Sequence, residues 1–138
     1  MNIIDRQTVL ISVDFNSLTT SEIQSPINLR FAADELILKS ISYSGNPADE
    51  NINVQIWCNI TNDNLIGAFP AKSPVALYLN SHFRISNSFQ TQILHLQFQR
   101  TDNGQPPFFY NPQDLITDVA GAVNGIVSLT LEFIKLSK

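Results

Sequence analysis

Residues 52–59 read INVQIWCN, and apolar and polar side chains alternate strictly along this stretch. Successive side chains of a β-strand point to opposite faces, so the alternation predicts a strand with one face against a core. The core face would carry Ile52, Val54, Ile56 and Cys58. Trp57 then falls on the polar face, where an aromatic side chain either covers a small cluster under a loop or meets a partner.

The same alternation recurs along the chain, between short segments rich in Pro, Gly, Asn and Asp that favour turns. Two of the predicted breaks are Asp34-Glu35 and Asn80-Ser81-His82. Seven further strands are predicted, at residues 8–15, 26–31, 36–43, 65–69, within 75–85, 93–99 and 126–136. The sequence therefore predicts an all-β chain of eight antiparallel strands.

Eight antiparallel strands in a chain of 138 residues fit a single domain, residues 1–138. This combination predicts a jelly-roll sandwich, in which two four-stranded sheets pack face to face. The immunoglobulin fold is the main alternative, but its Cys-Trp-Cys arrangement is absent, because Cys58 is the only cysteine and directly follows Trp57. Cys58 lies on the core face and is expected to be a small buried apolar side chain.

A long segment at residues 101–125 interrupts the strand pattern before the last predicted strand. Loops of this length inside one domain tend to serve a function. The segment contains three consecutive aromatic residues, Phe108, Phe109 and Tyr110. Together with Trp57 they form the candidate interaction surface, and the alternative for Phe108 and Phe109 is that they cap an open end of the sandwich.

The distribution of charge argues against nucleic acid as a partner. The chain carries 8 Lys and Arg against 12 Asp and Glu, a formal net charge of -4, and its basic residues lie far apart. Nucleic-acid binding relies on clustered basic side chains that displace counterions from phosphate. Only 14% of the residues are charged, below the roughly 25% of an average domain. We expect no direct nucleic-acid contact and a surface that tolerates close neighbours.

The sequence shows no recognisable catalytic or metal-binding constellation. His82 and His95 would share a metal only on neighbouring strands. The pattern of such a site, two His close in sequence with a carboxylate and a distant third His, is missing. Cys58 is expected to be too buried for nucleophilic chemistry. Asp102-Asn103-Gly104 favours a turn over calcium chelation. We predict that the protein is not an enzyme and has no catalytic residue, metal or cofactor.

The first residues lack the basic and apolar regions of a secretory signal. No apolar stretch approaches the ~18 residues that a membrane span needs. The single cysteine excludes an intramolecular disulfide. We expect synthesis inside the cell without a signal peptide, and no membrane span.

Three segments carry a resemblance to a known family, INLRFA at residues 27–32, SHFRI at 81–85 and VSLTLEFIK at 127–135. With the acidic composition and the eight predicted strands, the chain resembles the single jelly-roll capsid proteins of large icosahedral double-stranded DNA viruses and virophages. A single jelly roll in that family implies a penton protein, five copies of which close each vertex. The resemblance implies a location in the virion, a homopentamer and contacts with neighbouring capsid proteins, but transfers no role to any single residue.

A second function stays open, that of a carbohydrate- or receptor-binding module such as a trimeric fibre head. Its aromatic residues, Trp57, Phe108, Phe109 and Tyr110, would then stack on sugar rings. Against this function, three of the four are consecutive and are not spaced along one open sheet face. Five subunits would indicate a vertex protein, three a fibre head and one an isolated sugar-binding module.

Overall fold

The computed structural model describes residues 2–14, 22–44, 53–70, 75–101, 108–109 and 125–137. All the regular structure in this part of the chain is β-strand, which confirms the predicted all-β class. The strands are β1 (Ile3–Asp14), β2 (Glu22–Ser44), β3 (Asn53–Cys58), β4 (Leu65–Pro70), β5 (Val75–Thr101), β6 (Phe108–Phe109) and β7 (Ile126–Leu136). Within the described residues, no helix is long and apolar enough to cross a membrane.

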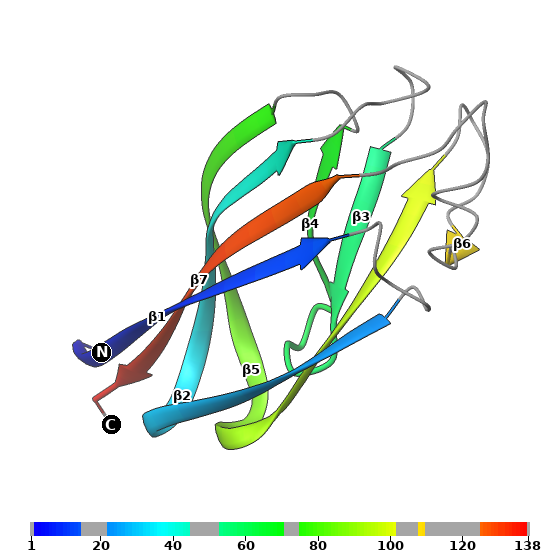
Figure 1. The fold of residues 1–138 in the computed structure, drawn as a ribbon. Coiled ribbons are helices and arrows are strands. Elements are labelled where there is room, and N and C mark those ends of the chain that lie inside the picture. The colour runs from blue at the N-terminus through cyan, green and yellow to red at the C-terminus, as the bar shows by residue number, and fades with distance from the viewer. Residues whose placement is uncertain are drawn as a thin grey trace.

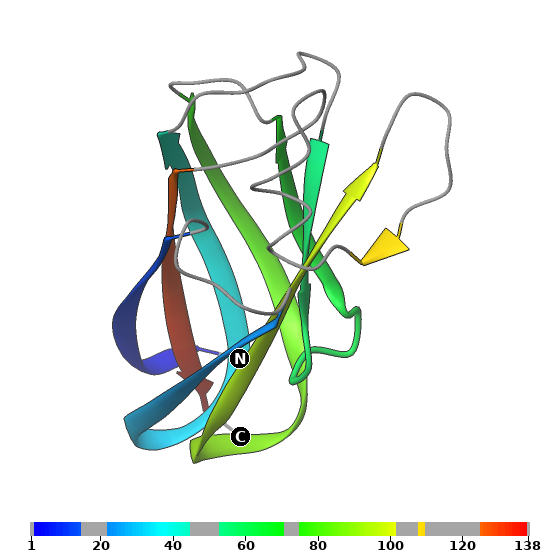
Figure 2. The same ribbon diagram turned by 45° about the vertical axis from the view of Figure 1, so that its right-hand side comes forward.

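The strands form one seven-stranded sheet in the order β1-β7-β2-β5-β3-β4, with β6 beside the end of β5. Every pairing between them is antiparallel. The sheet is strongly curled, so that β1 and β7 lie on one side and β3 and β4 face them from the other (Figures 1 and 2). The result is a half-barrel whose concave side encloses the core.

The curl arises in β2 and β5, because both strands bend and stay paired on each side of the bend. Residues 22–28 of β2 pair with residues 91–97 of β5, and residues 35–43 pair with residues 75–84. The register shifts between these two blocks, as it does where extra residues interrupt a ladder. Each of the two long strands therefore contributes to both sides of the molecule, with the bends in the lower part of Figure 1.

The register shifts in β2 coincide with a change in which residues face the core. Ile27, Leu29, Phe31 and Ala33 are buried at odd positions, Leu36 and Leu38 at even positions, and Ile41 and Tyr43 at odd positions again. A one-residue irregularity exchanges the two faces of a strand, and shifts lie between Ala33 and Glu35 and between Leu38 and Ser40. Near the second shift, Asn80 of β5 has a φ of 72°, a left-handed conformation that Asn adopts more readily than most residues.

The predicted breaks at Asp34-Glu35 and at Asn80-Ser81-His82 are wrong as chain turns, because both lie inside continuous strands. The merged pairs of predicted strands are 26–31 with 36–43 in β2, and 75–85 with 93–99 in β5. Two mergers and the additional β6 change the eight predicted strands to seven in the described residues. The hydrogen bonds run across one continuous sheet, in place of the two separate four-stranded sheets that were predicted.

The core is built from apolar side chains of all the long strands. Leu36, Leu38, Ile41, Ile56, Leu94, Leu96, Leu129 and Leu131 have no exposed surface. Cys58 is 3% exposed, which confirms the prediction of a buried small side chain. The rings of Tyr43 in β2 and Phe69 in β4 lie with their centroids 5.3 Å apart and join the two sides of the curl.

Polar contacts hold the edge strand β1 against the bend of β2. Gln7 Nε2 donates to the carbonyl oxygen of Asn28 at 3.3 Å, and the backbone N–H of Arg30 donates to Gln7 Oε1 at 3.1 Å. The Arg30 guanidinium also reaches Asp5 Oδ1 at 3.2 Å and the carbonyl oxygen of Arg6 at 3.0 Å. In the sheet order β1 neighbours only β7, so these contacts narrow the open side of the half-barrel.

We expect Gly67→Ala to destabilise the fold, because β4 passes close to β2 at this residue. A Cβ added at Gly67 would lie 2.7 Å from Leu38 Cδ2 and 3.4 Å from Ile41 Cδ1. The side chains of Leu38 and Ile41 are fully buried and have no free space into which to move. The free energy of unfolding, measured in urea, should fall by about 1–3 kcal/mol, the usual cost of overpacking.

The matched control is Ala68→Ser, at the exposed position beside Gly67. It should change the free energy of unfolding by less than about 0.5 kcal/mol. Combining Gly67→Ala with Leu38→Val should cost less than the sum of the two single changes, because valine lacks the Cδ2 atom that clashes. Unchanged stability of Gly67→Ala would contradict the close approach of the two strands.

Candidate functional site

Trp57 lies on the outer side of the sheet, as the alternation in residues 52–59 predicts. Its neighbours along β3 are buried in the core, whereas Trp57 is only partly buried. The register places Gln97 of β5 opposite Glu22 of β2 on one side and opposite Trp57 of β3 on the other. A carboxylate, an amide and an indole therefore share one row across three strands.

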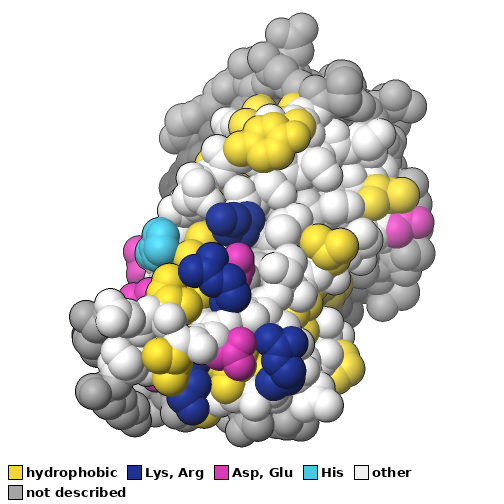
Figure 3. Space-filling model, turned by 90° about the vertical axis from the view of Figure 1, so that its left-hand side faces the viewer, with side chains coloured by type: hydrophobic (Ala, Val, Ile, Leu, Met, Phe, Trp, Pro, Cys, Tyr) yellow, Lys and Arg dark blue, Asp and Glu magenta, His cyan; other side chains and the backbone are white. Residues whose placement is uncertain are grey.

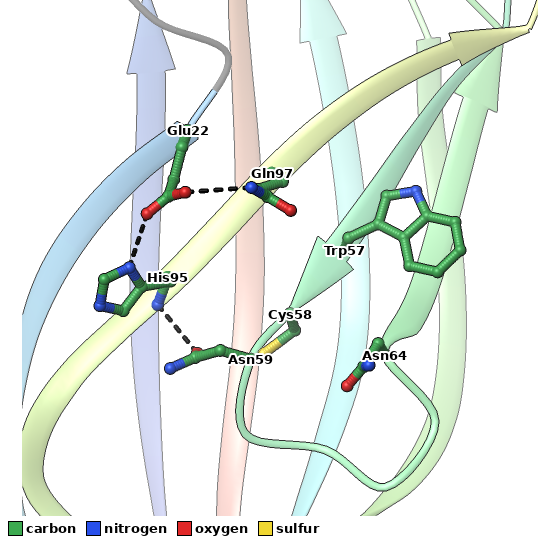
Figure 4. A pocket seen from close by; sticks show the side chains of 7 residues that line it. All are labelled: Glu22, Trp57, Cys58, Asn59, Asn64, His95 and Gln97. Carbon is green, nitrogen blue, oxygen red and sulfur yellow. Dashed lines mark hydrogen bonds and ion pairs between the residues drawn. The ribbon is translucent and has the colours of Figure 1, made fainter. Parts of the chain in front are cut away.

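This row forms part of an open pocket of about 590 Å³ on the outer side of the sheet (Figure 4). Glu22 comes from the start of β2, His95 and Gln97 from the second half of β5, and Trp57 from β3. The lining residues are Glu22, Trp57, Cys58, Asn59, Asn64, His95 and Gln97. Among the described residues the pocket thus combines one aromatic side chain with carboxylate, imidazole and amide groups, and no Lys or Arg lines it.

The Glu22 carboxylate is the electrostatic centre of the pocket. His95 Nδ1 lies 2.6 Å from Glu22 Oε1, and Gln97 Nε2 donates to Glu22 Oε2 at 3.0 Å (Figure 4). The hydrogen bond from His95 lowers the pKa of the Glu22 carboxyl below its usual value and outweighs the opposite effect of burial. The hydrogen bond from Gln97 lowers this pKa further. Glu22 therefore presents a fixed negative charge to the pocket at neutral pH.

The turn between β3 and β4 forms the wall next to His95. Asn59 Oδ1 accepts the backbone N–H of His95 at 2.9 Å, and the Cys58 N–H donates to the carbonyl oxygen of Asn64 at 2.7 Å. The turn is also tied to β5, since the Asn62 N–H donates to the carbonyl oxygen of Arg84 at 2.9 Å. These contacts within the protein hold the wall in place.

The structure does not bring His82 and His95 together. His82 lies on the first half of β5 opposite Ile37, and His95 lies on the second half opposite Gln24. The Glu35 carboxylate lies 4.0 Å from His82 Nδ1. Among the described residues, no group of three or more His, Cys, Asp or Glu side chains is placed to hold a metal ion.

Two of the predicted interaction residues lie next to the pocket along β5. Phe108 and Phe109 form β6, whose backbone pairs with Arg100 and Gln99 just beyond Gln97. Tyr110 and most of the predicted loop 101–125 lie outside the described residues. That the four aromatic residues form an interaction surface stays a prediction.

Sequence reasoning missed the polar half of the pocket. Glu22 lies between the predicted strands 8–15 and 26–31, but it begins β2 and meets residues 73 and 75 positions away. The sequence indicates His95 only as a candidate metal ligand and assigns Gln97 no role beyond its position in the predicted strand 93–99. The outward alternation of His95 and Gln97 was a usable signal, but only the strand register could show that Glu22 lies beside them.

The other outer face, over β1, β7 and the first half of β5, carries exposed apolar side chains. Leu10 is 74% exposed and Tyr78 is 86% exposed. Thr130 and Ser40 lie between them in the same row of the sheet. Figure 3 shows this side of the molecule, with separate hydrophobic patches in largely uncharged surface and Lys and Arg gathered toward the centre and bottom of the view.

Comparison with known proteins gives no family: no family model and no curated protein matches the chain. Among solved structures, the chain is similar to VP2 of the infectious bursal disease virus subviral particle, with 8% identity, a TM-score of 0.30, and 99% of this chain and 43% of that chain covered. It is also similar to a structure of the Gx strain of this virus, with 7% identity, a TM-score of 0.23, and 93% and 41% of the two chains covered. The chain spans less than half the length of these proteins, and the similarity is weak.

The lowered pKa of Glu22 predicts a pH-dependent contribution to stability. A carboxyl whose pKa is lowered by folding stabilises the protein above its ordinary pKa of 4.5, and this stabilisation is lost as the pH falls through the lowered value. The melting temperatures of the wild type and Glu22→Gln should therefore differ most near neutral pH and converge in acid. Asp63→Asn, at an exposed position, is the control for removing one negative charge and should show no such convergence. A difference that persists unchanged into strong acid would contradict the ionic role of Glu22.

Proposed function

We propose that this chain is a jelly-roll capsid protein, five copies of which close a vertex of an icosahedral shell. The observation that carries the proposal is the nested order of strand pairing. The first strand, β1, pairs with the last, β7, and β3 pairs with β4. Between them, the first half of β2 pairs with the second half of β5, and the second half of β2 with the first half of β5.

If the two halves of β2 and of β5 are counted separately, β1 to β5 and β7 form eight segments in chain order. The first segment pairs with the eighth, the second with the seventh, the third with the sixth and the fourth with the fifth. This is the winding of a long hairpin rolled up on itself, which an eight-stranded jelly roll requires. The continuous hydrogen bonding through β2 and β5 is compatible with this winding, because a sharply bent strand can belong to both layers of a sandwich. The domain then spans residues 1–138.

The outer face over β1, β7 and β5 supports association with further copies of the chain. Leu10 and Tyr78 are large, exposed and apolar, and such side chains are commonly covered in assemblies. The hydroxyl groups of Thr130 and Ser40 between them can hydrogen-bond across an interface that retains water. The protein would be a component of the virion that contacts itself and neighbouring capsid proteins, without direct nucleic-acid contact, cofactor or catalysis.

The alternative is a carbohydrate- or receptor-binding module, such as the trimeric head of a fibre. The pocket beside Trp57 favours this alternative, because it offers an aromatic side chain with polar groups close by. The two functions differ in subunit number. A binding pocket on one face and assembly through the other are also compatible in one protein.

We expect native mass spectrometry at high protein concentration to show five subunits of 15.4 kDa each. Leu10→Ser combined with Tyr78→Ser should raise the dissociation constant of this assembly about tenfold or more, because buried large side chains dominate interface energies. The melting temperature of the separate subunit should change little, since both side chains are exposed.

Ile93→Ser is the matched control, because Ile93 is 47% exposed and lies on the opposite outer face of the sheet. It should leave the subunit number and the dissociation constant unchanged. A stable trimer would overturn the vertex role in favour of a fibre head. A monomer at every concentration, and no fivefold grouping when particles are imaged, would favour an isolated binding module.

A further inference from the structure

The pocket beside Trp57 has the size and lining of a site for a small polar ligand. Its volume of about 590 Å³ lies within the roughly 300–1,000 Å³ that is usual for such sites. It is bounded by an indole from β3 and by hydrogen-bonding groups from β2, β5 and the β3–β4 turn. Figure 4 shows these side chains on neighbouring strands, with Gln97 between Glu22 and Trp57.

The polar groups of the pocket are held in place by contacts within the protein. Glu22 is fixed by His95 and Gln97, at 2.6 Å and 3.0 Å. The main chain of His95 is fixed in turn by Asn59 at 2.9 Å. Binding of a ligand here costs little side-chain entropy, because these side chains are already ordered. Even a few hydrogen bonds then yield measurable affinity.

The chemistry of the lining excludes several classes of ligand. A phosphate or sulfate group would meet the Glu22 carboxylate, and among the described residues no Lys or Arg lines the pocket to offset the repulsion. Among the described residues no group of three or more His, Cys, Asp or Glu side chains is placed to hold a metal ion, and Glu22 and His95 are already bonded to each other. A wholly apolar ligand would leave the carboxylate and the amides without partners, which is costly.

A neutral sugar satisfies all of these constraints. Its hydroxyl groups both donate and accept, as a carboxylate and amides require, and each oxygen of a carboxylate can accept more than one hydrogen bond. The C–H face of its ring is apolar and can pack on the flat indole of Trp57, which supplies contact area at low entropic cost. We propose that this pocket binds a neutral sugar ring, with Trp57 as the platform and Glu22 and Gln97 as hydrogen-bonding partners of its hydroxyl groups.

This site is independent of the proposed assembly surface. Trp57 lies on the outer side of the layer formed by β3, β4 and the second half of β5, whereas Leu10 and Tyr78 lie on the layer formed by β1, β7 and the first half of β5. A subunit can therefore join neighbours through one layer and keep the pocket of the other accessible. Sugar binding and subunit number can be tested separately in the same preparation.

The experiment is a titration of the assembled protein with free glucose, galactose, mannose and N-acetylglucosamine. Trp57 is the only tryptophan of the chain, so its fluorescence reports directly on the pocket. We expect at least one of these sugars to cause a saturable change in emission with a dissociation constant of about 0.1–10 mM. The same sugars displayed on a solid surface serve as a second arm, because tighter binding of the displayed forms would identify a surface glycan as the ligand.

Variants separate the pocket from other sites. Saturation-transfer NMR, which needs no tryptophan, should show loss of sugar binding in Trp57→Ala and partial retention in Trp57→Phe. Glu22→Gln should weaken binding about tenfold, because a hydrogen bond to a charged group is lost. Asp63→Asn, which removes a negative charge at an exposed position outside the lining of the pocket, is the matched control and should bind as the wild type does.

The proposal is overturned if none of the four sugars gives saturable binding in either arm, or if Trp57→Ala and Glu22→Gln bind as tightly as the wild type. Trp57→Phe and Glu22→Gln, checked by their melting curves, keep the test valid if Trp57→Ala does not fold. Native mass spectrometry of Glu22→Gln should give the wild-type subunit number. Loss of sugar binding with unchanged assembly thus tests this site alone, and changed assembly in Leu10→Ser with Tyr78→Ser tests the capsid role alone.

Discussion

The pairing of β2 with β5 is the constraint on which the rest of the structure depends. Both strands bend, and they stay hydrogen-bonded through residues 22–28 with 91–97 and through residues 35–43 with 75–84. Every other long strand joins one side of this bent pair. β7 pairs with the later half of β2 and is followed by β1, and β3 pairs with the later half of β5 and is followed by β4. Without the bend the sheet would be flat, and its apolar face could not enclose itself. The contacts of Gln7 and Arg30 with the bend matter for the same reason, because they hold the far edge of the sheet close to it.

The sequence predicts the strands well because alternation is a local property, and the bends poorly because a bulge and a turn look alike in one sequence. In β2 the positions that join the core cluster change from odd to even after Ala33 and back to odd after Leu38, while Ile37 is buried outside that cluster. Such a change indicates either that the chain reverses or that one extra residue is inserted in a continuing strand. Asp34-Glu35 and the segment around Asn80 carry turn-forming residues, which favoured the first interpretation. The partner strand decides between the two, and the partner lies far away in the sequence.

The sequence likewise predicts only the part of the candidate site that depends on local alternation. The outward position of Trp57 follows from the alternation of residues 52–59 alone. The positions of the polar side chains do not follow from the alternation, because Glu22 contacts His95 and Gln97, which lie 73 and 75 residues away in the sequence. The carboxylate is therefore a product of strand register: a shift of one residue between β2 and β5 would turn Glu22 toward the core and remove it from the pocket.

The two outer faces of the half-barrel differ in the kind of contact that each can make. Around Trp57, side-chain hydrogen bonds are already made and a rigid polar surface remains, which suits a small ligand that replaces a few water molecules. Around Leu10 and Tyr78, large apolar side chains stand in a surface of hydroxyl groups, and only a broad partner can cover them. The bend that joins the two layers also separates these surfaces, because β2 and β5 each contribute one half to each layer. Assembly on one layer therefore need not disturb recognition on the other, and the folding of a single pair of strands sets up both.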